Sequence, residues 1–292
     1  MKVAIAGASG MVGTALSQYL TSKGHEVTPL RRNRGGGADN AFADVTPEYL
    51  SKFDAVINLA GENIAEKRWT AEQKKAIEES RTITTGFLAR TLAKTSIKPT
   101  VFINASAIGF YGNRDAEILT EDSAAGNGFL PIVCKAWEKA TEPAKRDGLR
   151  VVRARIGVVI SKQGGALSKM LLPFQMGGGG ILGSGKQYMS WISIHDIVRA
   201  FEFLLTSDNI AGPVNLVAPN PVTNEEFTKV LGGVLHRPTI LPAPGFALKI
   251  ILGDMAQEML LEGNRVKPAK LETAGFTYEY PNLKEAIERE VK

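Results

Sequence analysis

The feature that most constrains the fold of this chain is its first 13 residues, MKVAIAGASGMVG. A short apolar run, Val3 to Ala6, leads directly into three evenly spaced glycines, Gly7, Gly10 and Gly13. A helical pattern follows, and its apolar face consists of Val12, Leu16, Tyr19 and Leu20. A strand, a glycine turn and a helix in this order form a seat for the pyrophosphate of a dinucleotide at the helix N-terminus.

Each glycine has a separate physical role in such a turn. Gly7 permits the tight turn, Gly10 lets the backbone approach the phosphates, and Gly13 lets the helix pack close to the strand. The alternative is an ordinary glycine-rich turn between a strand and a helix in some other α/β protein. The apolar run before the glycines and the amphipathic helix after them favour the dinucleotide site, because the fingerprint requires that context.

Composition and charge narrow the class of protein. The chain has 292 residues, of which 44% are hydrophobic and 22% charged, as expected for a globular protein with a large core. Its net charge of +5 comes from scattered Lys and Arg rather than a basic block, so no nucleic-acid partner is expected. Cys134 is the only cysteine, which excludes an intrachain disulfide, and no metal site is expected.

The N-terminus also resembles a signal peptide, because Lys2 precedes a mildly apolar stretch with an A-x-A-like site. The glycine spacing and the amphipathic helix favour a folded unit instead, and we expect a cytoplasmic protein. No stretch is long and apolar enough to span a bilayer, so no membrane partner is expected. The sequence does not indicate an oligomeric state.

Short apolar runs alternate with amphipathic stretches over the first two-thirds of the chain. This pattern predicts an α/β fold with a Rossmann-type, doubly wound parallel sheet, followed by a smaller, mostly helical C-terminal domain. The predicted strands are 2–6, 26–30, 55–59, 100–105, 150–156 and 214–217, and the predicted helices include 70–94, 129–146, 167–175, one after His195, and 283–291. We expect residues 1–218 to form the nucleotide-binding domain, with 163–190 contributing to the substrate side, and residues 219–292 to form the C-terminal domain.

The type of cofactor is indicated by the end of the second predicted strand. An NAD site carries an acidic residue about 20 residues past the glycines, but here Leu30 is followed by Arg31 and Arg32. Guanidinium groups at this position would pair with a 2′-phosphate, which predicts NADP(H), although a solvated basic loop is the alternative. Asp44 is placed either to contact the adenine edge or to cap the turn into Pro47.

Three further segments complete a family pattern: NLAG at 58–61, SAIGFYG at 106–112 and WISIHD at 191–196. Together with the glycine turn they resemble an extended short-chain dehydrogenase/reductase, the class that includes nucleotide-sugar epimerases. More narrowly, the chain resembles the atypical "epimerase family" subgroup, which adds a small C-terminal domain. Further matches to that subgroup are Asn63, Trp69, Ser80, Arg81, Cys134, Trp137, Glu138 and the segments 183–187 and 265–268.

The resemblance implies a set of functional residues. The implied cofactor contacts are Gly7, Ser9, Gly10, Met11, Gly13, Arg31, Arg32, Asp44, Leu59, Ala60 and Gly61. Ser106 occupies the position of the active-site hydroxyl, which hydrogen-bonds the reacting carbonyl or alcohol. The alternative is that Ser106 ties down the end of its strand. The catalytic interpretation is favoured because ligands lie at the carboxyl ends of such strands.

The resemblance breaks at the proton-transfer pair. The family carries Tyr-x-x-x-Lys on a helix, and registration by Glu138 puts Leu130 and Cys134 in those two positions. Leucine has no proton to give, and Cys134 is expected to be a small buried hydrophobic residue. Lys135 lies on another helix face, toward solvent. Tyr111 is the best substitute phenol, although packing beneath the cofactor loop is an equally good interpretation.

Less is indicated about the substrate side. The glycine-rich segment 177–185 is either a mobile lid or an exposed connection, and Lys186, Gln187 and Trp191 are predicted to line the substrate side. His195 and Asp196 are expected to cap a helix rather than to transfer protons.

These observations predict an NADP(H)-binding oxidoreductase or epimerase-like enzyme. It would move hydride between nicotinamide and a carbonyl or alcohol of a small polar substrate, for which a nucleotide sugar is one candidate. The alternative, which the missing Tyr and Lys support, is a catalytically silent NADP(H)-sensing or regulatory protein on the same fold.

Overall fold

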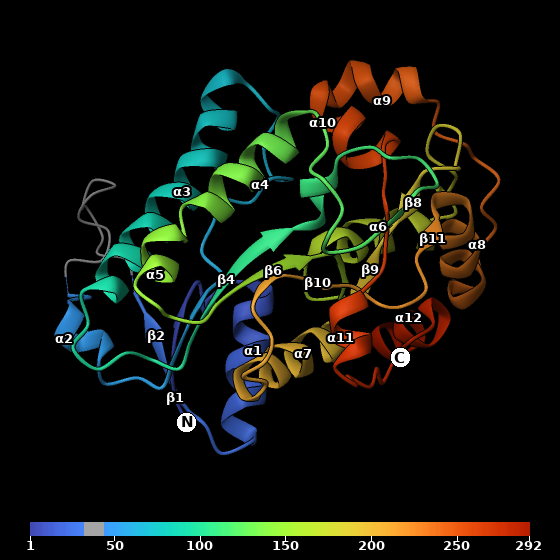
Figure 1. Cartoon of the computed structure of the whole chain (residues 1–292). Helices are drawn as coiled ribbons and strands as arrows, with labels where there is room; N and C mark the ends of the chain where they lie inside the picture. The colour runs from blue at the N-terminus through green and yellow to red at the C-terminus, as the bar shows by residue number, and fades with distance from the viewer. Residues whose placement is uncertain (32–43) are drawn as a thin grey trace.

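Six parallel strands form the central sheet of the computed structural model, which describes residues 1–31 and 44–292 (Figure 1). The strand order is β10-β6-β4-β3-β1-β2, and every neighbouring pair is parallel. The strands are β1 (Lys2–Ala6), β2 (Glu26–Leu30), β3 (Ala55–Asn58), β4 (Val101–Ala107), β6 (Val151–Ile156) and β10 (Gly212–Leu216). The predicted Rossmann-type parallel sheet is therefore confirmed, with strand ends shifted by no more than a few residues.

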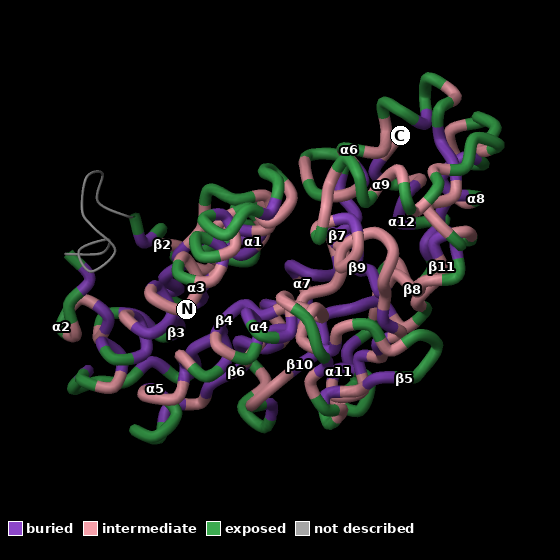
Figure 2. The backbone as a smooth tube through the Cα atoms, turned by 90° about the horizontal axis from the view of Figure 1, so that it is seen from above, coloured by how far each residue is buried: buried purple, intermediate pink, exposed green. Residues whose placement is uncertain are grey.

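Helices cover both faces of this sheet, because alternate residues of each buried strand point to opposite apolar layers. Val3 and Ile5 of β1 pack toward α1 (Met11–Ser22) and α7 (Ile194–Thr206). Ala4 and Ala6 pack toward the opposite layer, which α2 (Pro47–Leu50), α3 (Ala71–Ala93) and α5 (Glu142–Arg146) complete. The inner strands β3 and β4 are buried along nearly their whole length (Figure 2), whereas the edge strand β2 is only partly buried.

A second apolar core lies beyond the carboxyl ends of the strands (Figure 1). Its central side chains are Trp191, Phe227 and Ile287. The elements around it are β7 (Val158–Ile160), α6 (Gly165–Gln175), β8 (Tyr188–Met189), β9 (Trp191–Ser193), β11 (Val222–Thr223), α8 (Asn224–Leu235) and α12 (Leu283–Val291). Segments before and after residue 218 thus share this core. The predicted division of the chain at residue 218 stays a prediction.

Further helices and strands complete the described part of the chain. They are η2 (Ile108–Tyr111), β5 (Ile118–Leu119), α4 (Phe129–Lys139), α9 (Gly245–Leu252), α10 (Asp254–Ala256), η3 (Gln257–Leu261), β12 (Arg265–Val266) and α11 (Ala269–Thr273). The mostly helical character predicted for the C-terminal part is confirmed. Across the described ranges, no helix has the length and apolarity needed to cross a membrane.

One helix prediction needs correction. The predicted helix at 129–146 is two helices, because α4 ends at Lys139 and α5 begins at Glu142. Pro143 has no backbone N–H to continue the hydrogen-bond ladder, which explains the break. Pro268 is the N-cap residue of α11. Thr223 and Glu226 form a capping box at the N-terminus of α8.

Candidate cofactor and catalytic site

The turn between β1 and α1 has a backbone that accepts only small residues. Gly7 has a φ of +80°, and a Cβ at that position would lie 2.6 Å from the carbonyl carbon of Leu59. A Cβ at Gly13 would overlap the carbonyl oxygen of Gly7, so the first turn of α1 packs directly on the end of β1. Gly10 donates its N–H to the Gly7 carbonyl over 3.1 Å, which closes the turn.

The N-terminus of α1 is open to an anion. Its N-cap, Gly10, has no side chain, and no acidic residue lies in the first turn. The first amides of a helix carry a partial positive charge and have no partner within the helix, so a phosphate group can accept from them. The glycine turn and this helix terminus together fit the pyrophosphate of a dinucleotide.

The turn after β3 lies beside the glycine turn. Leu59 donates its N–H to the Ala6 carbonyl over 2.8 Å, and Ala60 is held by the Asn58 side chain. Gly61 is exposed and lies against the guanidinium of Arg81. Because β1 has β2 on one side and β3 on the other, these two turns flank the switch point of the sheet, where such folds bind ligands.

Other predicted cofactor contacts lie around the same opening. Ser9 is exposed and Met11 half-buried, and Met11 lies against Gly164 at the start of α6. Arg31 directly follows β2 and is exposed. Asp44, the first described residue after residue 31, is also exposed. Arg32 lies outside the described residues. The sequence analysis did not predict that Gly164 approaches Met11. The adjacent glycines at 164 and 165 were the available signal, because glycines allow a close approach of the backbone to another part of the chain.

A buried amide network supports the switch-point turn. Asn58 donates through Nδ2 to Asn104 Oδ1 over 2.7 Å and to Thr85 Oγ1 over 2.9 Å. Trp137 Nε1 donates to the same Thr85 oxygen over 2.9 Å. Sequence reasoning missed this network, because its members come from β3, β4, α3 and α4. It holds Asn58 in the orientation that accepts from Ala60.

Ser106 and Tyr111 belong to a second buried network. Ser106 is 2% exposed and donates its hydroxyl proton to Glu138 Oε1 over 2.8 Å. Arg155 binds the same carboxylate through Nε and Nη2, over 2.8 and 3.0 Å, and donates through Nη1 to the Tyr111 hydroxyl over 2.9 Å. Tyr111 donates in turn to Asn215 Oδ1 over 2.7 Å. The structure therefore brings the two predicted catalytic hydroxyls into one hydrogen-bonded cluster.

This cluster follows from strand register. Ser106 of β4 pairs with Arg155 of β6, and Arg155 pairs with Asn215 of β10, so the three residues form one row across the sheet. Burial raises the pKa of Tyr111, although the neighbouring Arg155 lowers it. Arg155 and Asn215 were not anticipated, because nothing local in the sequence distinguishes them from other polar strand residues.

The two helix positions at which the family carries its Tyr and Lys lie beside η2, directly after β4. Leu130 and Cys134 both lie against Gly109 in η2. Burial raises the pKa of the Cys134 thiol to about 12, and the charge of Glu138 adds to this effect. The thiol is therefore neutral and enclosed, as expected of a small hydrophobic residue. Lys135 is exposed, as predicted.

The N-terminus of α4 is closed by a side chain from the C-terminal part. Glu258 accepts from the N–H of Phe129 through Oε1 over 2.9 Å and from the N–H of Leu130 through Oε2 over 2.8 Å. A second contact, between Lys74 Nζ and Asp254 Oδ2 over 2.6 Å, joins α3 to α10. These contacts hold residues 254–261 across the N-terminal ends of α3 and α4.

The predicted substrate residues do not share one surface. Lys186 is exposed, whereas Gln187 donates through Nε2 to the carbonyls of Leu182 and Leu260. Trp191 is fully buried in the second core and donates through Nε1 to the Asn220 carbonyl. Their contact with a substrate stays a prediction.

The segment 177–185 is tied to residues 241–243 by backbone bonds. Gly183 donates to the Ala243 carbonyl, and Ala243 donates to the Ile181 carbonyl. Gln187 adds the link to Leu260 described above, so this segment is anchored at several points.

His195 lies in the first turn of α7, where a helix start was expected. The cap itself is Ser193, whose oxygen accepts from the Asp196 N–H. His195 instead pairs with Glu290 of α12, with 3.3 Å between Nε2 and Oε1. In the part of the chain that the structure describes, no group of three or more His, Cys, Asp or Glu side chains could hold a metal ion.

Comparison with known sequences finds relatives along the whole chain. The sequence model of the NAD dependent epimerase/dehydratase family matches residues 3–217, and a domain of unknown function (DUF1731) matches residues 243–290. The epimerase family protein Mb2239 of Mycobacterium bovis is 43% identical over 290 residues, covering 98% of this chain and 96% of that protein. The epimerase family protein SDR39U1 of Bos taurus is 38% identical over 291 residues, covering 98% of each.

Solved structures are similar over nearly the whole chain. The crystal structure of human epimerase family protein SDR39U1 (isoform 2) with NADPH has a TM-score of 0.90 at 34% identity, covering 99% of both chains. A nucleoside-diphosphate sugar epimerase from Corynebacterium glutamicum has a TM-score of 0.82 at 36% identity, covering 99% of this chain and 58% of that one. A Thermus thermophilus UDP-glucose 4-epimerase, with a TM-score of 0.75 at 17% identity, shows likeness of fold alone.

Proposed function

The chain belongs to the NAD-dependent epimerase/dehydratase family, and from that premise we propose that it binds NADP(H) at the turn between β1 and α1. The observation that carries the proposal is the open N-terminus of α1 behind a turn that accepts only small residues. Arg31, exposed directly after β2, supports NADP(H) because a guanidinium can pair with the 2′-phosphate. NADPH is the ligand named for the 34% identical human SDR39U1.

The proposed activity is that of an oxidoreductase or epimerase-like enzyme acting on a carbonyl or alcohol of a small polar substrate. The bound nicotinamide would supply or accept a hydride. The chain's own contribution is to seat the cofactor at the switch point and to hold residues 254–261 across the N-terminal ends of α3 and α4. The Corynebacterium glutamicum relative is described as a nucleoside-diphosphate sugar epimerase, which makes a nucleotide sugar one substrate class to test.

Proton transfer requires a rearrangement of the buried cluster. Ser106 and Tyr111 are the proposed catalytic hydroxyls, yet each donates its only proton inward, to Glu138 and to Asn215. Either hydroxyl must exchange that bond before it can donate to a substrate. The same observation favours the second candidate, a catalytically silent NADP(H)-sensing protein, because the cluster is complete without a substrate.

Cofactor binding and turnover separate the two candidates. NADPH and NADH binding is measured by nicotinamide fluorescence, and NADPH oxidation is then followed with a panel of small carbonyl compounds and nucleotide sugars. The enzyme proposal expects NADPH binding together with turnover of at least one substrate, lowered in Ser106→Ala or Tyr111→Phe. Binding without turnover across the panel supports the silent candidate, and absence of binding overturns both.

If turnover survives both substitutions at full rate, the proton-transfer roles of Ser106 and Tyr111 are wrong while the cofactor proposal stands. Thermal unfolding of each variant shows whether a loss of turnover reflects a loss of the folded protein. The cytoplasmic location and the small-molecule substrate stay predictions alongside these roles.

A further inference from the structure

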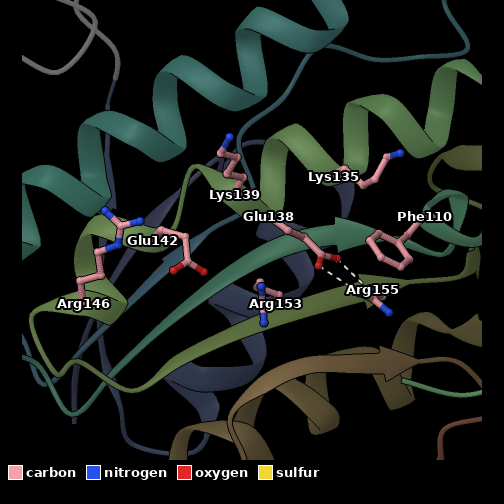
Figure 3. A pocket seen from close by; sticks show the side chains of 8 residues that line it. All are labelled: Phe110, Lys135, Glu138, Lys139, Glu142, Arg146, Arg153 and Arg155. Atoms are coloured by element: carbon pink, nitrogen blue, oxygen red, sulfur yellow. Dashed lines mark hydrogen bonds and ion pairs between the residues drawn. The ribbon is translucent and has the colours of Figure 1, made fainter. Parts of the chain in front are cut away.

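A groove of ≈ 460 Å³ lies between α4, α5 and β6, apart from the glycine turn (Figure 3). In the sheet, β4 and β3 separate β6 from β1, so the groove and the turn after β1 lie over different strands. The side chains that line the groove are Phe110, Lys135, Glu138, Lys139, Glu142, Arg146, Arg153 and Arg155. A volume of this size falls in the range of small-molecule sites, which is about 300–1,000 Å³.

The lining carries five cations against two carboxylates. Arg155 is already neutralised by its two hydrogen bonds to Glu138. Within residues 1–31 and 44–292, no carboxylate pairs with Lys135, Lys139, Arg146 or Arg153. Several cations in one concave site repel one another, and a bound anion would remove that repulsion.

The arginines of β6 are placed where a strand of this sheet would ordinarily carry apolar side chains. Val151, two residues before Arg153, packs in the apolar layer shared with α3 and α5. Arg153 and Arg155 follow on the same face, because strand side chains alternate. On the helix side, Lys135 and Lys139 of α4 and Arg146 of α5 line the same groove (Figure 3).

From this arrangement we propose that the groove is a binding site for a phosphate-bearing small molecule. A planar guanidinium on β6 and two flexible ammonium groups on α4 match the oxygen atoms of a phosphate or diphosphate group. The Arg155 guanidinium covers one face of the Phe110 ring, 3.5 Å from the ring centroid, so that face is closed to a stacking base. The proposal does not depend on turnover or on cofactor binding.

The test measures binding of inorganic pyrophosphate by calorimetry at constant ionic strength, with and without saturating NADPH. NADPH is included because the turn after β1 is itself a seat for pyrophosphate. We expect binding that persists with NADPH present and weakens by at least about tenfold in Arg153→Gln and in Lys139→Gln. Lys139 is exposed, so its variant is expected to fold, and Lys94→Gln, a change of the exposed lysine at the C-cap of α3, is the matched control.

A second readout locates the ligand directly. Backbone amide shifts in a ¹⁵N-labelled protein should change on pyrophosphate addition around residues 135–146 and 151–155. Shifts confined to residues 7–14, or equal affinity in the wild type, Lys139→Gln and Lys94→Gln, would overturn the proposal. A failure of NADPH to bind, with the pyrophosphate effect intact at α4 and β6, would count against the proposed function and leave this site standing.

Discussion

Arg155 and Glu138 form a two-point ion pair beneath the end of β4, with 2.8 Å between Nε and Oε1 and 3.0 Å between Nη2 and Oε2. Arg155 is 3% exposed and Glu138 is 4% exposed, so neither charge is solvated by water. Ser106 donates to the same carboxylate, and Tyr111 accepts from the same guanidinium. The orientation of both proposed catalytic hydroxyls therefore depends on this pair.

Removing one charge of this pair should destabilise the protein strongly. Glu138→Gln leaves Arg155 buried without a counter-charge, and the free energy of unfolding should fall by about 3–5 kcal/mol in urea denaturation. Glu138→Gln with Arg155→Met should cost less than the sum of the two single changes, because the double variant has no unpaired charge. The control is Glu142→Gln on α5, and an equal effect there would contradict the buried-pair argument.

The Cys134 thiol should be unreactive in the folded protein. Burial raises its pKa from 9.0 to about 12, so the thiolate is nearly absent at pH 8. A raised folded pKa means that the neutral thiol contributes stability below pH 9.0, and this contribution is lost as the pH rises toward 12. Iodoacetamide labelling followed by mass spectrometry should be slow without urea and fast above the unfolding midpoint. Fast labelling of the native chain at pH 8 would show that the thiol is accessible.

Gly10 and Gly13 should respond differently to substitution. A Cβ at Gly10 would lie 3.5 Å from the Gly7 carbonyl oxygen, so Gly10→Ala should fold with a loss of about 1 kcal/mol and bind NADPH weakly. A Cβ at Gly13 would overlap backbone atoms of residues 7 and 8, so Gly13→Ala should lower stability as well as binding. Gly233→Ala, which meets nothing within 4 Å in α8, is the control. Thermal unfolding and NADPH fluorescence distinguish the outcomes.

Arg31→Ser should reduce the preference for NADPH. The side chain is exposed directly after β2, and loss of a charged hydrogen bond to the 2′-phosphate should weaken NADPH binding about tenfold or more. NADH binding should stay unchanged, because NADH lacks that phosphate. Lys94→Ser serves as the control for a change of net charge. Equal weakening of NADPH and NADH would contradict the assignment.

Glu258→Gln should loosen residues 254–261 from α4. The carboxylate accepts from two amides at the N-terminus of α4, and its charge is favourable beside the positive end of the helix. The change should lower stability by about 1 kcal/mol and increase amide hydrogen exchange in this segment. Glu262→Gln, whose carboxylate pairs with Gln257 and not with α4, is the matched control. Unchanged exchange in Glu258→Gln would show that other contacts hold the segment.

Local sequence patterns were enough for the main elements of the fold. The apolar run before Gly7 and the helical spacing after Gly13 identified β1 and α1, and the turn chemistry of glycine explains why these signals are local. The two-residue strands β5, β8, β11 and β12 were not anticipated, since pairs so short have no periodicity to detect. Pro143 indicates a helix break in the sequence, but the apolar pattern on either side of it favoured one continuous helix, and the break was not predicted.

The sequence by itself determined the class of fold, the glycine turn and the departure from Tyr-x-x-x-Lys, because each depends on residues close together in the chain. Only the tertiary structure decided which groups accept the hydrogen bonds that Ser106 and Tyr111 donate. Their partners, Glu138, Arg155 and Asn215, reach them through strand register and helix packing across tens of residues. Burial and pairing are properties of that assembly, so the same hydroxyls that suggest catalysis in the sequence form a closed network in the folded chain.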